Sequence, residues 1–303
     1  MVSDIVLNNG VPMPQLGIGV WRASDREAAY AVAEALRIGY RSVDTAAMYG
    51  NEPGVGRAVA ASGVPRDQVF VTTKVNNPDH GYDQALRAFD ASLSRLGFDY
   101  VDLYLIHWPL PRQNRYVDTW RALEKLYADA QVRAIGVSNF QIPHLQRLLD
   151  ETDVVPALNQ IELHPYLGQS ELRAYHAEHG IATEAWSPLA KGGALLRDPV
   201  ITALAAKYGR TPAQIVAAAL EEDADVVGLS VLSGSHLSVV PEVVDGLRAA
   251  GLTDVPVVVG GIIPEADAAA LQAAGVARVF TPKDFEIAEV LSQVVDAIEE
   301  ARG

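Results

Sequence analysis

VFVTTKV (69–75) and VDLYLIH (101–107) are the two apolar runs that decide the fold. Each is apolar on both faces, which is typical of a strand covered by helices on both sides of a parallel sheet. The stretch between them places Leu86, Phe89 and Leu96 on one helical face, together with Leu93. Residues 69–107 are therefore predicted to form a parallel β–α–β unit.

The same pattern of strand and helix recurs along the chain at intervals of about 25 to 30 residues. Ser24 with Glu27 forms a capping box ahead of one helix, and Thr211-Pro212 begins another. The opening IVLNNGVPMP is predicted to be a hairpin that turns at Asn-Gly, outside the repeat. The sequence thus predicts an α/β protein with a parallel sheet. The other strands are expected at 15–21, 40–46, 132–138, 156–162, 182–188, 225–231, 255–261 and 277–282.

Composition excludes several classes of protein. The 303 residues include 24 basic and 38 acidic side chains, so the net charge is −14. Because such a chain is repelled by nucleic-acid phosphates and by anionic membranes, we expect neither as a partner. The absence of cysteine excludes disulfides and cysteine nucleophiles. MVSDIVLNNG is no signal peptide and no apolar run is long enough for a membrane span, so we expect a cytoplasmic protein.

Four residues with chemically active side chains stand at the ends of three consecutive predicted strands. Asp44 lies inside the final part of the second strand and Tyr49 in the loop that follows it, while Lys74 and His107 lie at the ends of the third and the fourth strand. Barrel enzymes place their catalytic groups at the carboxyl ends of the strands. We therefore expect these four side chains to converge on one pocket.

These residue types suit the reduction of a carbonyl group by hydride transfer. The developing alkoxide needs a proton, and a phenol with a free pKa of about 10 is a poor acid near neutrality. The Lys74 ammonium is expected to lower the pKa of Tyr49, while Asp44 keeps Lys74 charged despite burial. His107 is expected to orient the carbonyl oxygen and share the proton.

Six ordered motifs, VDTAAMYGNE, VTTK, DLYLIHWP, IGVSNF, NQIELHP and AWSPL, resemble those of the aldo-keto reductases over about residues 3–215. The resemblance implies a (β/α)₈ TIM-barrel fold and NADPH-dependent reduction of small aldehydes, ketones or keto-sugar acids, with Tyr49 as the proton donor. It also implies roles for further residues. Ser138, Asn139 and Gln160 match the residues that hold the nicotinamide carboxamide, and Trp186 matches the aromatic residue that stacks on the nicotinamide ring. Ser187 and Leu189 match the loop along the pyrophosphate. Trp21 and Trp108 match the walls of the substrate pocket.

The tail, about residues 211–303, resembles a different family. Ser230–Leu232, the glycines Gly260 and Gly261 and the FTP motif at 280–282 are similar to the flavodoxin-like cobalamin-binding domain of the methylmalonyl-CoA mutase group. That family's Asp-x-His-x-x-Gly ligand motif is not found, so cobalt ligation is not expected. The reductases' Pro-Lys-Ser motif, which the resemblance assigns to the adenosine 2′-phosphate, is missing as well. The chain therefore resembles a fusion, natural or engineered.

Two domains follow from these resemblances. Residues 1–210 supply the first seven β/α units of the barrel, and residues 211–303 supply a closing strand at 225–231 and extra flavodoxin-like β/α units. The leading functional interpretation is a monomeric reductase that uses NADPH on a small carbonyl substrate, without a metal. A fold chimera without efficient activity and a cobalamin-binding module are the alternatives.

Overall fold

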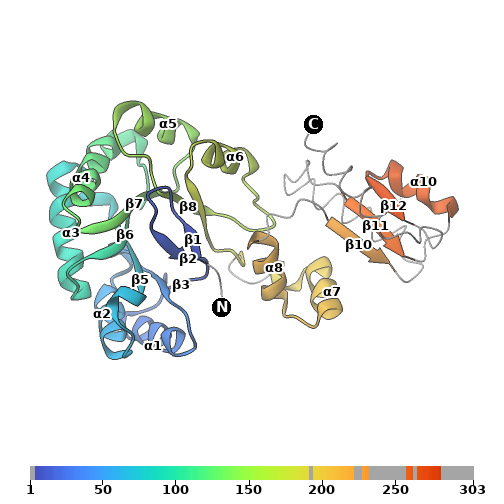
Figure 1. Ribbon diagram of the computed structural model, residues 1–303, viewed down its shortest axis with the longest axis horizontal. Helices are drawn as coiled ribbons and strands as arrows, with labels where there is room; N and C mark the ends of the chain where they lie inside the picture. The colour runs from blue at the N-terminus through green and yellow to red at the C-terminus, as the bar shows by residue number, and fades with distance from the viewer. Residues whose placement is uncertain (1–3, 191–193, 222–226, 232–256, 262–264, 281–303) are drawn as a thin grey trace. The chain divides into compact units, whose positions relative to one another are not determined.

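The computed structural model describes residues 4–190, 194–221, 227–231, 257–261 and 265–280 (Figure 1). The chain divides into two compact units. The first comprises Met1–Ile161 with Glu171–Glu184, and the second comprises Glu162–Ser170 with Ala185–Gly303. The predicted domain boundary near residue 211 stays a prediction.

A seven-stranded sheet, whose strands follow one another in chain order, carries the predicted fold. Each pairing from β3 to β8 is parallel, which confirms the repeated β/α pattern as a TIM-barrel-like arrangement. β5 and β6, the runs quoted first, are buried along their whole length, as their apolar faces predict. The strands are β3 (Ile18–Gly19), β4 (Ser42–Asp44), β5 (Phe70–Val75), β6 (Val101–Ile106), β7 (Val132–Ser138), β8 (Leu158–Glu162) and β9 (Ala182–Trp186).

Helices α1 to α5 surround these strands on the outside (Figure 1). Ser24 and Glu27 form the predicted capping box of α1. The predicted core face of α3 is rotated slightly: Ala85 and Ser92 are buried beside Phe89 and Leu96, whereas Leu86 and Leu93 are only half-buried. Small side chains on that face allow close packing, which periodicity alone does not reveal. The helices are α1 (Asp25–Arg37), α2 (Glu52–Ala61), α3 (Tyr82–Leu96), α4 (Tyr116–Ala128), α5 (Ile142–Glu151) and α6 (Ser170–Glu178), and 3₁₀ turns lie at η1 (Ala47–Tyr49), η2 (Arg66–Gln68), η3 (Asn77–Asp79) and η4 (Pro111–Gln113).

The predicted N-terminal hairpin covers one end of the apolar interior. β1 (Asp4–Val6) pairs antiparallel with β2 (Pro12–Pro14), and Gly10 takes the positive φ of 82° that the turn requires. Leu7 and Met13 are buried in one cluster with residues from four of the barrel segments. Burial of this apolar surface is what holds the hairpin across the strands. The barrel members of the cluster are Phe70, Leu103, Leu105, Ala134, Ala157 and Leu158.

The second unit contains a short parallel sheet of its own. β10 (Val227–Val231), β11 (Val257–Gly261) and β12 (Arg278–Phe280) pair in chain order, and both pairings are parallel. In the described residues β10 pairs with β11, and the expectation that residues 225–231 take the eighth barrel position stays a prediction. Residues 232–236 and the Thr-Pro of the FTP motif lie outside the described residues. The helices of this unit are η5 (Leu195–Arg197), α7 (Pro199–Tyr208), α8 (Pro212–Glu221), which Thr211 caps as predicted, and α10 (Glu265–Ala273).

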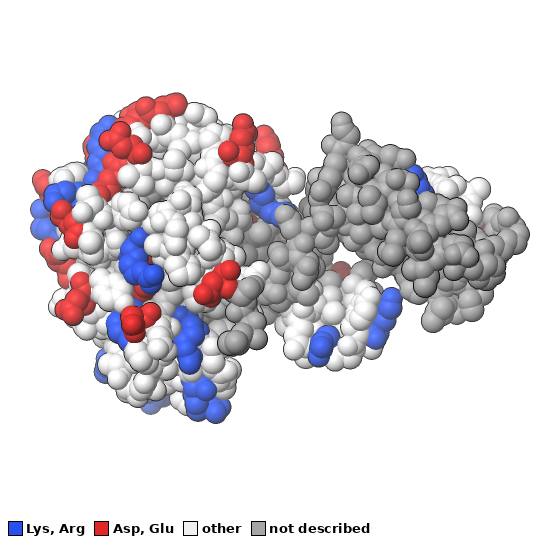
Figure 2. Space-filling view, viewed as in Figure 1, with Lys and Arg blue, Asp and Glu red and all other residues white. Residues whose placement is uncertain are grey.

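The described surface mixes the two signs of charge. On the face of the first unit in Figure 2, acidic and basic side chains alternate and do not gather in one patch. Within the described ranges, no helix combines the length and the apolar character that a membrane crossing needs.

Candidate active site

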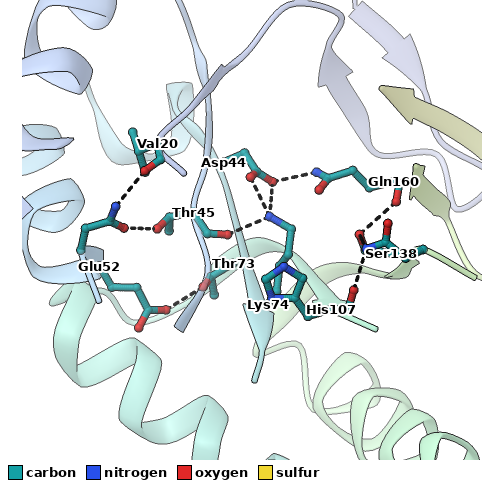
Figure 3. Close-up of polar contacts among 11 residues, drawn as sticks. Val20, Asp44, Thr45, Glu52, Thr73, Lys74, His107, Ser138 and Gln160 are labelled. Atoms are coloured by element: carbon teal, nitrogen blue, oxygen red, sulfur yellow. Dashed lines mark hydrogen bonds and ion pairs between the residues drawn. The ribbon is translucent and has the colours of Figure 1, made fainter. Parts of the chain in front are cut away.

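The structure brings together the ends of the three strands that carry Asp44, Lys74 and His107 (Figure 3). Asp44 is the last residue of β4, and Lys74 lies one residue before the end of β5. The fully buried Lys74 Nζ is 2.6 and 2.7 Å from the two Asp44 carboxylate oxygens and donates a third hydrogen bond to the Thr45 carbonyl oxygen at 3.0 Å. Burial lowers the pKa of Lys74, but Asp44 and Tyr49 raise it more, so the pKa is raised overall. Lys74 is therefore a buried ammonium ion at neutral pH.

The loop that carries Tyr49 is anchored by polar residues of the same motif. Tyr49 ends η1, and Gly50 follows in the left-handed conformation. Asn51 is fully buried, donates to the carbonyl oxygens of Val20 and Ala23 at 2.9 Å each, and accepts from Thr45 Oγ1 at 2.7 Å. These bonds satisfy a buried amide and fix the entry into α2.

A buried carboxylate holds the next turn of that loop. Glu52 accepts a hydrogen bond from Thr73 Oγ1 (Figure 3) and another from Arg95 Nε, each at 2.6 Å. Because Thr73 precedes Lys74 on β5, this contact ties the Tyr49 loop to the strand that carries the lysine. Sequence analysis missed Asn51 and Glu52, although both stand within the VDTAAMYGNE motif.

Tyr49 and His107 face each other beside the ammonium group. Their ring centroids are 5.6 Å apart with an interplanar angle of 78°, and Lys74 Nζ lies 5.3 Å from the Tyr49 ring centroid. His107 directly follows β6 and is buried. The predicted convergence of these four side chains is thus present in the structure, while their catalytic roles stay a proposal.

The environment of Tyr49 adds a second effect to the expected one of Lys74. Burial raises the pKa of Tyr49 and outweighs Lys74, which lowers it; Asp44 and Glu184 raise it further. The expected lowering of the Tyr49 pKa by Lys74 is present, but burial outweighs it, because the desolvation of a phenolate depends on all the atoms packed around it. Tyr49 is therefore held protonated near neutral pH.

His107 is held in its neutral form. Burial, assisted by the nearby Lys74 charge, lowers the pKa of His107 from 6.5 to about 3. A neutral imidazole can orient a carbonyl oxygen through an N–H donor, but it carries no extra proton to transfer. Of the two rings, the Tyr49 phenol is therefore the one that can donate a proton to an alkoxide.

Ser138, Asn139 and Gln160 form the adjoining side of the site. Ser138 Oγ donates to the Gln160 carbonyl oxygen at 2.9 Å, and Asn139 Nδ2 donates to the His107 carbonyl oxygen at 3.0 Å. Gln160 Nε2 donates to Asp44 Oδ2 at 2.8 Å. An ionised carboxylate only accepts hydrogen bonds, so this contact sets the orientation of the Gln160 amide.

Glu184 completes the cluster, and the sequence analysis did not identify it. The Gln160 side chain hydrogen-bonds to Glu184, and Glu184 Oε2 is buried without a hydrogen-bond partner among the described residues. Burial and the neighbouring Asp44 charge raise the pKa of Glu184 from 4.5 to about 7. A signal was present in the sequence: Glu184 stands two residues before Trp186 on β9, hence on the same face of that strand.

The other predicted site residues lie at the end of a strand or in the segment that follows one. Trp21 and Trp108 are both exposed, with 46% and 40% of their surfaces accessible, in the segments after β3 and β6. Trp186, Ser187 and Leu189 belong to the second compact unit, and Ser187 has a positive φ of 49°. Their proximity to the other site residues stays a prediction.

Comparison with known proteins agrees with this geometry. The model of the Aldo/keto reductase family matches residues 13–245. The chain belongs to the aldo/keto reductase family. It is accordingly an oxidoreductase of that type, and the family match extends beyond residue 215, where the motif resemblance ends.

Individual relatives share about half of the aligned residues. The methylglyoxal reductase DkgA of Yersinia pestis is 56% identical over 214 residues, 70% of this chain and 76% of the relative. The crystal structure of an aldo/keto reductase from Brucella melitensis has a TM-score of 0.70 and 52% identity, and covers 73% of this chain and 86% of its own. A mutant of Gox0644 in complex with NADPH has a TM-score of 0.68 and 48% identity, and covers 71% of this chain and 78% of its own.

Proposed function

We propose that the chain reduces small aldehydes, ketones or keto-sugar acids with NADPH, and that Tyr49 donates the proton. The observation that carries this proposal is the pairing of a protonated Tyr49 phenol with a buried Lys74 ammonium, fixed by Asp44. The name of the Yersinia pestis relative, a methylglyoxal reductase, and the solved Gox0644 complex with NADPH support the substrate class and the cofactor.

The residues present fit a nicotinamide cofactor. Gln160 Nε2 is engaged by Asp44, and Glu184 also bonds to this side chain, so the amide oxygen is the atom that suits a carboxamide N–H. Ser138 and Asn139 lie directly beside it, on β7 and in the turn that follows. We propose that these three residues hold the carboxamide, and that Trp186, Ser187 and Leu189 contact the ring and the pyrophosphate.

Each polar group then has one task in the reaction. NADPH, when bound, supplies the hydride that reduces the carbonyl carbon. The neutral His107 imidazole orients the carbonyl oxygen, and Tyr49 gives its proton to that oxygen. Lys74 stabilises the phenolate that remains, and Asp44 balances the lysine charge. Trp21 and Trp108 are proposed as apolar walls for the substrate.

The test uses the full-length protein with methylglyoxal. We expect NADPH to quench the tryptophan fluorescence, and methylglyoxal to cause the loss of reduced-nicotinamide absorbance. Quenching without turnover would favour the alternative of a fold chimera without efficient activity. If a protein shown to be folded by circular dichroism gives neither quenching nor turnover, the proposal is overturned.

The finer assignment of the tail is a separate proposal. Three parallel strands in chain order, β10, β11 and β12, are what half of a flavodoxin-like domain would contain, and this supports the resemblance to cobalamin-binding domains. The missing histidine motif argues against cobalt ligation. A visible-absorption titration with cobalamin is therefore expected to show no spectral change, and a saturable change would favour a binding module.

A further inference from the structure

Glu184 is a half-buried acid beside the polar cluster, with one carboxyl oxygen fully buried, and no step of the proposed reaction uses it. It lies on β9 two residues before the strand ends at Trp186, among groups from four other elements. The charged or titratable groups that act on it are Asp44 of β4 and Lys74 of β5, and it in turn acts on Tyr49 of η1. Gln160 of β8 provides the uncharged contact.

The Gln160 side chain links this acid to the lysine and the tyrosine. Its amide nitrogen donates to Asp44 Oδ2 at 2.8 Å, Asp44 binds Lys74 Nζ at 2.6 Å, and the same side chain bonds to Glu184. Two carboxyl groups that share one amide and one ammonium cannot both be ionised without a cost, because each disfavours the charge of the other. With Asp44 ionised against Lys74, Glu184 is the carboxyl group of the pair that gains and loses its proton near neutral pH.

We propose that Glu184 is a positioning residue for proton donation. While its carboxyl group is protonated, Tyr49 acts as the acid; once Glu184 ionises, its negative charge retains the phenol proton and slows the transfer. This inference rests on the proposed function and adds a control by pH. It rests on the contacts that link Glu184 through Gln160 to Asp44 and Lys74, and it is supported by the effect of the glutamate charge, which raises the pKa of the phenol. The buried Oε2 atom without a partner in the described structure shows that no hydrogen-bond donor stabilises that charge fully.

The direction of the pH dependence follows from the raised pKa of Glu184, about 7 instead of 4.5. Below this value the acid is neutral and reduction is fast, and above it the acid is charged and reduction slows. In Glu184→Gln the side chain stays neutral at every pH, so the decline near neutrality disappears. At pH 8 we expect its single-turnover rate to exceed that of the wild type by about two- to fivefold. Glu178→Gln, which removes an exposed charge from α6, is the matched control and keeps the wild-type profile.

A readout without cofactor separates this inference from the proposed function. NMR titration of labelled glutamate carboxyl carbons in the cofactor-free wild type is expected to show one resonance that titrates near neutrality and is absent in Glu184→Gln. In labelled-tyrosine spectra, the Tyr49 phenol is expected to titrate at a lower pH in Glu184→Gln than in the wild type, because a charge that raises its pKa is gone.

Each result decides one question. If all glutamates of the wild type titrate in their ordinary acid range, or if Glu184→Gln keeps the wild-type pH profile and Tyr49 titration, the inference is overturned. Because the wild-type titration needs no variant, a poorly folded Glu184→Gln protein does not block the test. If Glu184 and Tyr49 titrate as expected but Tyr49→Phe reduces methylglyoxal at the wild-type rate, the proposed function fails instead.

Discussion

At the residue scale, the chemistry depends on two rings that meet beside one ammonium group. Burial keeps both rings uncharged: it raises the pKa of the Tyr49 phenol and lowers the pKa of the His107 imidazole. Both effects follow from the cost of charge in an apolar environment. The structure therefore divides the tasks, with proton donation by Tyr49 and orientation by His107.

Replacement of Tyr49 by phenylalanine tests that division. The Tyr49→Phe protein loses the donated proton and keeps the ring that packs against His107. We expect kcat/KM for methylglyoxal to fall by about 10²- to 10⁴-fold, the usual contribution of a general acid. The dissociation constant of NADPH, measured by fluorescence quenching, is expected to stay within about twofold of the wild-type value, because the binding residues are unchanged.

Tyr104→Phe is the matched control for this substitution. Tyr104 is fully buried, packs edge-on against Phe89 at 5.0 Å between centroids, and its hydroxyl has no partner in the described part of the chain. Removing that hydroxyl is expected to leave the rate unchanged and to raise the free energy of unfolding by about 1 kcal/mol. Equal losses of rate in both variants would contradict the assignment of Tyr49.

At the element scale, the N-terminal hairpin contributes to stability through the buried side chain of Leu7, and the exposed neighbour Val6 serves as a comparison. Leu7 is 2% accessible and contacts the barrel cluster, whereas Val6 is 73% accessible. We expect Leu7→Ala to lower the free energy of unfolding by about 2–5 kcal/mol, because it leaves a cavity. Urea unfolding of Leu7→Ala and Val6→Ala measures the difference.

Val6→Ala is expected to change that free energy by less than about 0.5 kcal/mol, as most surface substitutions do. Comparable losses in the two variants would show that the hairpin does not seal the apolar interior.

The predicted hairpin position came from the Asn-Gly turn, which is a local signal. Its packing against β5, β6 and β7 is a long-range contact that no local pattern specifies.

At the scale of the whole molecule, buried histidines make the folded chain sensitive to acid. Burial lowers the pKa of His80 and of His176 from 6.5 to about 4, and that of His107 to about 3. The unfolded chain takes up these protons below pH 6.5, whereas the folded chain binds them only near pH 4 and below. Their contribution to stability is therefore complete above about pH 6.5 and is lost as the pH falls.

Denaturant unfolding at several pH values measures this loss. Each histidine adds a slope of about 1.4 kcal/mol per pH unit between about pH 6 and pH 4. In His80→Gln, whose side chain does not titrate, we expect the slope to fall by about that amount. A slope that stays unchanged would show that His80 is protonated in the folded protein.

The missing phosphate-binding motif leads to a prediction about cofactor choice. The resemblance places the contacts to the 2′-phosphate in a Pro-Lys-Ser segment that this sequence lacks. Each lost hydrogen bond to a charged group is worth about 1.5–3 kcal/mol. We therefore expect the dissociation constants of NADPH and NADH, measured by fluorescence quenching, to lie within about tenfold of each other. A preference for NADPH above a hundredfold would reveal another basic site for the phosphate.

Local patterns in the sequence were enough to determine the strands, the hairpin and the four residues Asp44, Tyr49, Lys74 and His107. Strand burial and strand ends follow from side chains that alternate with period two, so neighbouring residues contain the information. Only the tertiary structure decided the role of Glu184, the anchors Asn51 and Glu52, and the direction in which the pKa of Tyr49 moves. These depend on which atoms from distant strands surround a group, because the cost of burial and the attraction of a charge are both set by three-dimensional distance.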